Sequence, residues 1–416
     1  MLVGTNLQYA NSYNNRIVLE TIRLYGPLSR VDIAKKTQLT AQTVTNITKK
    51  LMEAGLVLED SKHQPGRGAP SIRLKVNYSA AYSIGLDVDK HHMTAVMLNL
   101  GGEICQRSQF ELDYPDPNTT MDMMERTIHQ LISLQKIDIK KIWGVGVALP
   151  GPMAASKGSE FANVVSPQAM PSWSNVPVVH ELEERLGLPV VLKNNASAAA
   201  MGELWFGSAR HIPSFFYVYL GAGLGGGIVV NGQLYAGDTG NAGELGYFPS
   251  SQLSETEQSV ENDHVGAFFR IPELVRSIFP EKELLRSSET MAQLYTEKHP
   301  ALLAWLDTAK KKLAPLMLSV EYLLDPEVIF FGGHLPDNIV QDMIQYLHQT
   351  LPGLRVDRKA TRPDFRIASA GYDAAALGVA AFPLYSSFAP LPDLLLKKQK
   401  SGTSTFERKS HFEKEE

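Results

Sequence analysis

Cysteine is nearly absent from this sequence, which narrows the folds and metal sites that it can form. Cys105 is the single cysteine among 416 residues. One thiol cannot form a disulfide within the chain, and it excludes a zinc site built from several cysteines of one chain. We therefore predict no disulfide framework, no metal site and no bound cofactor.

Long apolar runs are missing as well. No stretch approaches the roughly 20 apolar residues that cross a bilayer, and no basic segment followed by an apolar run opens the sequence. We expect a cytoplasmic protein with no membrane partner. The hydrophobic content of 44% still allows a large core, shared between two or three domains.

Acidic side chains are scarce in residues 1–78. This segment has 11 basic and 5 acidic side chains and carries +6, whereas the remainder has 29 and 39 and carries −10. A basic segment on an acidic body suggests a head that binds nucleic acid. Charge alone does not decide this, because a short solvated segment can carry the same surplus.

The basic segment has the signals of three short helices. Helices are expected over residues 14–25, 30–36 and 41–54, with Ser29 and Thr40 as the N-caps of the second and third. The third helix has one apolar face and one face of short polar side chains. Two helices around a tight turn, the second with such a polar face, describe a helix-turn-helix.

A β-hairpin wing is predicted behind these helices. The apolar run 56–58 and the alternating run 72–76 flank a polar tip that contains basic residues and glycines. The alternative interpretation is a small helical domain that binds proteins. We favour DNA binding, because helix order, cap positions, wing and charge agree independently.

The DNA-binding residues are predicted from side-chain chemistry. Side chains that could reach base edges are Gln42, Thr43 and Asn46, and those suited to phosphates are Lys49, Lys50 and Arg67. Arg30 and Thr45 complete the predicted set.

Beyond residue 78 the pattern predicts an α/β body. Strands are expected at 82–87, 93–98, 103–110, 143–149, 189–192, 217–220, 228–230 and 327–331, and helices at 121–134, 196–206, 313–324 and 374–385. In open α/β sheets, ligands bind beyond the carboxyl ends of the strands. Such ends are occupied by Asp87, Pro150-Gly151, Asn194-Asn195 and the glycine-rich segment 221–227.

The densest glycine cluster lies within residues 217–247. Apolar runs on both sides of segment 221–227 predict a hairpin whose glycine turn leaves backbone N–H groups free to approach a phosphate or a sugar. A plain structural turn is the alternative. Further on, Asn231-Gly232 favours a type I′ turn, because both of its central residues need φ > 0.

Four sequence blocks carry a specific resemblance. They are VGVALPGPM, LGAGLGGGIVVNGQLYAGDTGNAGELGY, LLDPEVIFFGG and SAGYDAAALGVAAF. Their content and order resemble the ROK family (repressors, open reading frames, kinases), and the resemblance runs from the helix-turn-helix to about residue 385. It implies a two-lobed, actin-like, sugar-kinase-like body. The winged head is similar to that of the family's repressor branch, of the Mlc, NagC and XylR type, because the family's kinases lack it.

Two departures from the family pattern argue against phosphoryl transfer. At the position of Asn195, the family's kinases have an Asp that takes a proton from the sugar hydroxyl, and an amide cannot accept it. The first phosphate loop of those kinases resembles Asp-x-Gly-Gly-Thr, whereas here it reads Asp87-Val88-Asp89-Lys90-His91. The alternative is that Asp89 replaces the missing base.

The family's zinc motif is also missing. In ROK proteins Glu-x-Gly is usually followed by a His and then by Cys-x-Cys-Gly-x-x-Gly-Cys, whereas here Tyr247 follows and no cysteine appears in 248–264. We expect His264 to be an ordinary surface or loop histidine. Tyr247 could replace the imidazole beside a sugar, or it could fill the space left by the zinc site.

The resemblance implies that a sugar pocket persists without a catalytic residue. The predicted effector-binding residues are Gly151, Asn194, Asn195, Glu244 and Tyr247. Asn175 is a further candidate for the pocket lining, and Trp173 is expected in the core.

Four segments are expected: a winged helix-turn-helix domain over 1–78, a first α/β lobe over 79–195 plus about 370–395, a second lobe over 196–369, and a disordered tail over 397–416. The sequence predicts a non-enzymatic repressor of carbohydrate genes. It would bind double-stranded operator DNA as a homodimer or homotetramer and respond to a sugar or sugar phosphate. Two alternatives stay open: an active sugar kinase with a DNA-binding appendage, and a regulator with an empty pocket that a protein partner controls.

Overall fold

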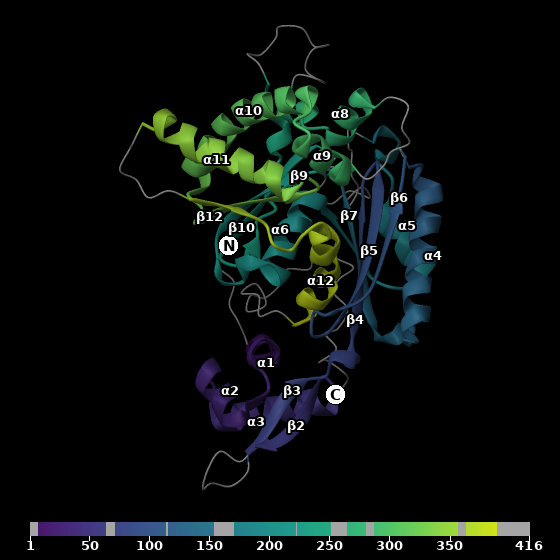
Figure 1. Cartoon of the computed structure of the whole chain (residues 1–416). Helices are drawn as coiled ribbons and strands as arrows, with labels where there is room; N and C mark the ends of the chain where they lie inside the picture. Colours follow the sequence, from purple (N-terminus) through teal and green to yellow (C-terminus); the bar gives the residue numbers. More distant parts are fainter. Residues whose placement is uncertain are drawn as a thin grey trace.

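Two five-stranded sheets and a small winged head make up the described part of the chain (Figure 1). The structure, a computed structural model, describes residues 7–63, 71–113, 115–153, 170–221, 223–250, 264–279, 287–356 and 363–388. Arg67 and the predicted tail over 397–416 lie outside these residues. The predicted α/β class with a winged helix-turn-helix head is confirmed.

The head contains three helices and a three-stranded sheet of order β1-β3-β2. Its elements are α1 (Leu7–Tyr25), β1 (Leu28–Ser29), α2 (Arg30–Thr37), α3 (Ala41–Glu53), β2 (Val57–His63) and β3 (Ser71–Val76). Both predicted N-caps are present: Ser29 accepts from the N–H of Asp32, and Thr40 accepts from the N–H of Thr43. The first helix begins at Leu7 rather than at residue 14, because no glycine or proline interrupts the chain between them.

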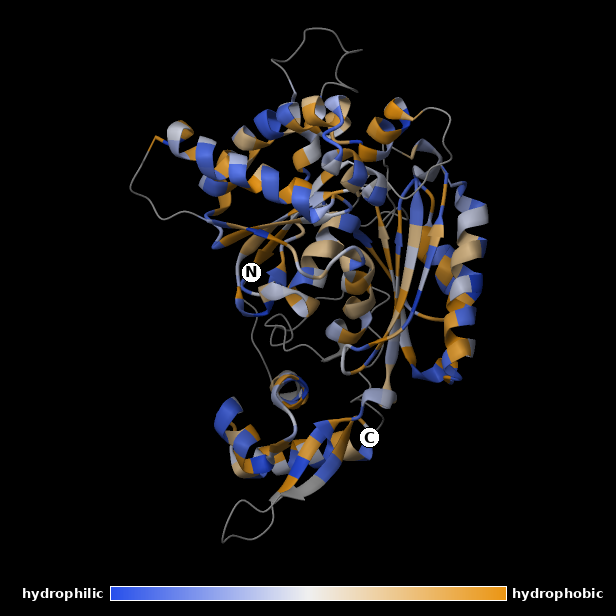
Figure 2. Ribbon diagram, viewed as in Figure 1, coloured by the Kyte–Doolittle hydropathy of each residue, from blue (hydrophilic) through white to orange (hydrophobic). Residues whose placement is uncertain are grey.

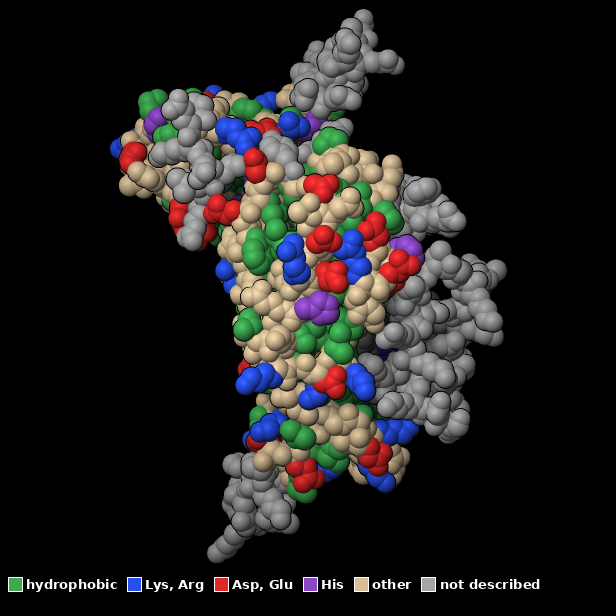
Figure 3. Space-filling view, turned by 90° about the vertical axis from the view of Figure 1, so that its right-hand side faces the viewer, with side chains coloured by type: hydrophobic (Ala, Val, Ile, Leu, Met, Phe, Trp, Pro, Cys, Tyr) green, Lys and Arg blue, Asp and Glu red, His purple; other side chains and the backbone are tan. Residues whose placement is uncertain are grey.

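The first sheet of the body has the order β6-β5-β4-β7-β8. Its strands are β4 (Tyr82–Val88), β5 (His92–Asn99), β6 (Ile104–Glu111), β7 (Ile142–Leu149) and β8 (Val190–Asn194). One face packs against α4 (Pro117–Gln135) and α5 (Val178–Leu186), and the other packs against α12 (Ala374–Phe388). Basic and acidic side chains are interspersed on the surface over α4 and α5 (Figure 3). Arg185 of α5, for example, forms an ion pair with Asp122 of α4.

The second sheet has the order β11-β10-β9-β12-β13. Its strands are β9 (Phe215–Leu220), β10 (Leu224–Val230), β11 (Gln233–Leu234), β12 (Val328–Gly333) and β13 (Asp364–Ile367). The surrounding helices are α6 (Asn195–Phe206), α7 (Val265–Phe268), α8 (Ile271–Ile278), α9 (Ser287–Thr296), α10 (Pro300–Leu324) and α11 (Asp337–Leu354). The helices α10 and α11 cover one face, and α6 packs on the other.

The glycines of β10 do not form the turn that the sequence predicted. Gly225, Gly226 and Gly227 pair with Tyr219, Val218 and Tyr217 of β9 inside the antiparallel ladder. A Cβ on Gly227 would meet Ala200 at 2.5 Å and the Ala196 carbonyl at 2.7 Å. These glycines therefore let α6 lie close on the sheet, and they do not turn the chain. The predicted turn at Asn231-Gly232 has positive φ at both residues, as a type I′ turn requires.

Helices α6 and α12 pack directly against each other between the two sheets. A Cβ on Gly202 would overlap the backbone of Ala374, and one on Gly378 would overlap the backbone of Ala198. The residues of α12 are mostly hydrophobic (Figure 2). This helix also contacts α1, and Ile22 of the head belongs to the same apolar cluster as Leu384 of the body. One helix thus touches the head, the first sheet and α6.

Candidate functional site

One pocket collects all five residues predicted to bind an effector. Its free space is about 650 Å³, including its opening to solvent. It lies at the carboxyl ends of β7 and β8 and beside the start of β10. The lining includes Gly151, Asn194, Asn195, Glu244 and Tyr247, together with His264 and Arg270. That these residues bind a sugar stays a prediction.

Asn194 joins helix α6 to the pocket. Its side-chain oxygen caps the helix, since it accepts from the N–H of Ala196 at 2.8 Å and from the N–H of Ser197 at 3.3 Å. Its side-chain nitrogen donates to Oε1 of Glu244 at 2.9 Å. The amide orientation is therefore fixed, and a ligand in the pocket meets the N–H side of Asn194.

Glu244 is the main acid of the pocket. Burial raises the pKa of its carboxyl group to about 7. A Cβ on Gly151 would overlap the Glu244 carboxylate and would lie 2.5 Å from the Asn194 amide. Glycine at 151 is thus required for the close contact of these two side chains. The site can offer hydrogen-bond acceptors and donors that suit sugar hydroxyl groups.

A histidine that the sequence interpretation set aside also faces this pocket. His264 stacks on Tyr247, with ring centroids 5.3 Å apart, and its Nδ1 lies 2.8 Å from the carbonyl oxygen of Gly246 and 3.2 Å from the backbone nitrogen of Ala267. The other ring nitrogen, Nε2, is buried and has no hydrogen-bond partner. The expectation of an ordinary surface or loop histidine was therefore incomplete. Tyr247 remains 37% exposed, so it does not fill a core gap.

Trp173 and Asn175, which precede α5, are not among the residues that line the pocket. Trp173 is fully buried and its indole N–H donates to the carbonyl of Pro115 at 2.9 Å, which confirms the predicted core position. Asn175 has a positive φ of 63° and does not line the pocket, so its proposed role there is wrong. A small polar residue at 175 is explained by the left-handed backbone.

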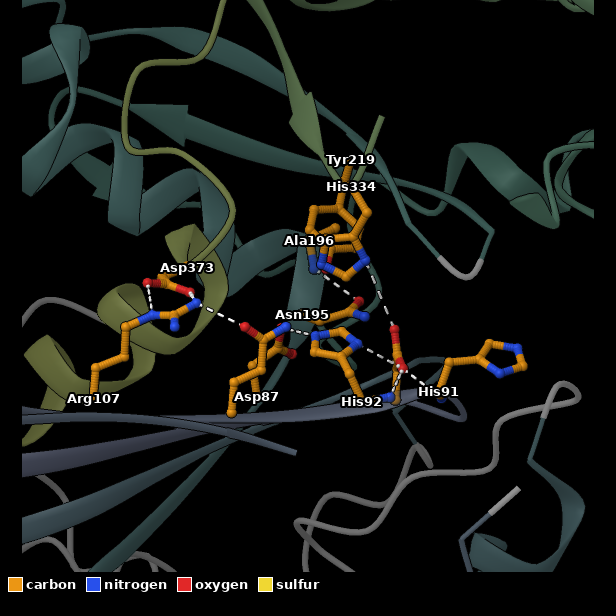
Figure 4. Close-up of polar contacts among 11 residues, drawn as sticks. Asp87, His91, His92, Arg107, Asn195, Ala196, Tyr219, His334 and Asp373 are labelled. Atoms are coloured by element: carbon orange, nitrogen blue, oxygen red, sulfur yellow. Dashed lines mark hydrogen bonds and ion pairs between the residues drawn. The ribbon is translucent and has the colours of Figure 1, made fainter. Parts of the chain in front are cut away.

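A second polar cluster lies beside the pocket, where the first phosphate loop was expected (Figure 4). Nδ1 of His92 lies 2.8 Å from Oδ1 of Asp89, and Nε2 of His92 lies 3.4 Å from Oδ2 of Asp87. Nδ1 of His334, which follows β12, lies 4.0 Å from Oδ2 of Asp89. Tyr219 brings its hydroxyl to 3.3 Å from Nε2 of His334.

Buried charge controls the ionisation of this cluster. Burial alone would lower the pKa of His92, but the charges of Asp89 and Asp87 raise it to about 10. Burial alone would raise the pKa of Asp89, but His92 and neighbouring N–H groups hold it well below its usual range. Burial lowers the pKa of His334 to about 3. Asp89 is thus a weak base that is held by partners and does not line the pocket, which argues against its use in proton transfer.

The residues present do not fit the zinc site of the ROK family. The single cysteine, Cys105, lies on β6 at the edge of the first sheet. Tyr247 occupies the position of the family's histidine and presents a phenol rather than an imidazole. We therefore derive no function through that zinc ion.

The predicted DNA-binding residues of α3 lie on its outer face. The buried face consists of Val44, Ile47, Thr48 and Leu51. The side chains of Gln42 and Asn46 are exposed and joined by a 3.1 Å hydrogen bond. The other exposed members of the set are Thr45, Lys49 and Lys50, while Thr43 is half-buried and Arg67 is not described.

Arg30 has a different position from the other predicted DNA-binding residues. Its Nε donates to the Thr48 hydroxyl at 3.1 Å, and the guanidinium reaches Met52. This contact joins α2 to α3 inside the head. Arg30 can fix the angle between the two helices, and its predicted contact with DNA stays a prediction.

Comparison with known proteins places the chain in one family. The model of the ROK family matches residues 83–384, which is most of the chain. The chain belongs to the ROK family. A solved ROK transcriptional regulator, a homologue of the Escherichia coli Mlc protein, has the same fold with a TM-score of 0.70 at 21% identity, covering 93% of this chain and 99% of that one. A ROK glucokinase from Streptomyces griseus, solved with glucose and AMPPNP, matches 73% of this chain and 99% of its own with a TM-score of 0.56 at 20% identity.

Similar curated proteins include a repressor and a dual transcriptional regulator. The xylose repressor of Bacillus subtilis is 28% identical over 239 residues, and the dual regulator NagC of E. coli is 27% identical over 254 residues. These alignments cover 58% and 60% of this chain. The chain spans about three fifths of the length of these relatives, 61% and 60%. Among the described residues, no helix is both long enough and apolar enough to span a bilayer.

Proposed function

We propose that this protein is a DNA-binding transcriptional repressor of carbohydrate genes that responds to a sugar or sugar phosphate in the Glu244 pocket. The observation that carries the proposal is the position of α12. This helix packs on α6, whose N-cap Asn194 holds Glu244, and it also contacts α1 of the winged head. The pocket and the DNA-binding surface are therefore linked through two packed helices.

The proposed mechanism is a change in the angle between the two sheets. A ligand that bonds to Glu244 and Asn194 favours the arrangement that best fits it, and its influence is limited to that preference. In a homodimer or homotetramer, a shift of α12 would change the spacing of the heads on an operator whose half-sites lie about one helical turn apart. The repressors of xylose and N-acetylglucosamine genes among the relatives support a carbohydrate effector.

Loss of phosphoryl transfer is part of the proposal. Asn195 cannot accept a proton, and the side chains of His92 and His334 occupy the region of the first phosphate loop. Incubation with ATP and a panel of sugars should release no ADP above the rate without sugar. Sugar-dependent turnover that Asp89→Asn abolishes would instead establish the rival kinase.

DNA binding is tested with duplexes selected by the full chain from a random-sequence library. Asn46→Ala should relax the preference at an adenine position and cost about 1–3 kcal/mol there. Lys49→Ala should weaken binding to all duplexes and reduce the slope of log K against log salt by about 1. Fluorescence anisotropy at several salt concentrations measures both effects.

The matched control is Lys311→Ala, which removes the same charge from a surface pair on α10, far from the head. It should leave operator affinity unchanged.

The same assay repeated with xylose, N-acetylglucosamine and their phosphates tests the effector. Full operator binding by a chain that lacks residues 1–78 would contradict the proposal. If a pull-down recovers a protein partner while calorimetry shows an empty pocket, control by that partner replaces the sugar response.

A further inference from the structure

Three buried ligand groups from both sheets meet beside the effector pocket. Asp87 ends β4, His92 begins β5, and His334 follows β12. The three residues are 1%, 5% and 8% exposed, and one ligand atom from each lies within 4.8 Å of the others. Two imidazoles and a carboxylate in this proximity are a common ligand set for transition metals.

Two atoms of this cluster are unsatisfied. Oδ1 of Asp87 and Nε2 of His92 are buried and have no hydrogen-bond partner. Leaving buried polar atoms unpaired is costly, so such atoms call for an explanation. The two side chains that carry these atoms lie next to each other, since Nε2 of His92 is 3.4 Å from Oδ2 of Asp87.

The neighbours of the two histidines orient them for metal binding. Asp89 lies 2.8 Å from Nδ1 of His92 and can accept its proton, which leaves Nε2 directed at Asp87. The Tyr219 hydroxyl can accept the proton on Nε2 of His334, which leaves Nδ1 as a ligand. A carboxylate or hydroxyl behind a ligating imidazole is the usual outer-shell arrangement of a metal site.

We propose that Asp87, His92 and His334 form a site for one divalent transition-metal ion, such as Zn²⁺. Zinc bonds of about 2.0–2.2 Å would draw the three ligand atoms closer than they now lie. The ion would take the place of the proton between His92 and Asp87 and would compensate the buried carboxylates. Mg²⁺ is disfavoured, because it prefers oxygen ligands and water.

A metal ion here would join the two sheets. Asp87 and His92 belong to the first sheet, and His334 belongs to the second. The ion would favour the arrangement of the two sheets in which His334 lies close to Asp87 and His92. The site is distinct from the family's cysteine-based zinc motif, and it stands independently of the effector proposed above.

The test uses the full chain, freed of metal with a chelator and titrated with Co²⁺ and then Zn²⁺. We expect one ion per chain by elemental analysis, and a visible Co²⁺ spectrum without a thiolate charge-transfer band. His92→Gln and His334→Gln should each weaken binding at least tenfold. Asp89→Asn, which replaces the carboxylate behind Nδ1 of His92 without removing a ligand, should weaken it about 10–100-fold.

The controls are His180→Gln, which changes an exposed histidine on α5, and Cys105→Ser, which removes the thiol. Both should bind the ion like the wild-type chain. If the histidine variants fail to fold, Zn²⁺ should still raise the Tm of the wild-type chain, and less so that of Asp89→Asn. Absence of binding to the wild-type chain, or unchanged affinity in His334→Gln, would overturn the proposal.

Discussion

Glu244 shows how burial changes the ionisation of a single carboxyl group. Its folded-state pKa of about 7 lies above the ordinary value of 4.5. A raised carboxyl pKa means that the folded state holds its proton more tightly than the unfolded chain does. The stability that this proton contributes is present below pH 4.5 and is lost as the pH rises to about 7.

Glu244→Gln should therefore stabilise the ligand-free protein at high pH. The amide keeps the acceptor for Asn194 but never ionises, so we expect a gain of up to about 3 kcal/mol at pH 8 and little change at pH 5. Urea unfolding of both chains at the two pH values measures this. An equal change at pH 5 and pH 8 would show that burial does not control the carboxylate.

The residue scale also shows what the sequence could and could not supply. Asn195, Glu244 and Gly151 were found because they occupy positions of a recognised motif, and the structure places them in one pocket. His334 was missed because it lies 242 positions beyond His92 in the chain, and only the approach of the two sheets brings the two histidines together. The visible signals were the His91-His92 pair and the histidine after Gly332-Gly333.

The helices α6 and α12 can pack this closely only because glycines lie at their contact. Gly378→Ala should destabilise the body by about 1–3 kcal/mol, because its Cβ would overlap Ala198 and force the helices apart. The matched control is Gly353→Ala on α11, where the added Cβ would meet no atom within 4 Å. That change should be neutral or stabilise by up to about 1 kcal/mol. Thermal unfolding of both variants makes the comparison, and equal losses would argue against tight packing at Gly378.

Element types were easier to predict than the reasons for individual residues. Caps at Ser29 and Thr40 act locally, so both were recognised from the sequence. The glycines 225–227 were predicted to form a turn, but they are needed for close packing against α6. The sequence around β10 does not show this packing, because α6 is a separate element. The helix expected at 313–324 begins at Pro300, where the proline at the first helical position is a local start signal.

The two halves of the body are tied together by ion pairs from α8 at the scale of the whole molecule. Nζ of Lys90, which is 2% exposed, lies 2.6 Å from Oε1 of Glu273, and Arg276 lies 3.2 Å from Asp113. Lys90 and Asp113 flank strands of the first sheet. Because Lys90 is buried, this pair differs from a surface salt bridge.

Glu273→Gln should weaken the link between α8 and the first sheet, because it removes the carboxylate that lies 2.6 Å from the buried ammonium group of Lys90. We expect a loss of about 1–3 kcal/mol, less than for a fully buried pair, since Glu273 is 36% exposed. The control, Glu184→Gln, alters an exposed pair on α5 and should change the Tm by less than about 1 °C. Differential scanning calorimetry separates the two. A larger radius of gyration in the Glu273 variant by X-ray scattering would show that the halves move apart.

Asn195 has one more consequence for the proposed regulator. A kinase consumes the sugar that it binds, so its occupancy depends on the rate of supply as well as on affinity. With an amide at this position the bound molecule would leave unchanged, and occupancy would follow the free concentration alone. The cell would then read how much sugar is present at equilibrium, and the reading itself would cost no ATP.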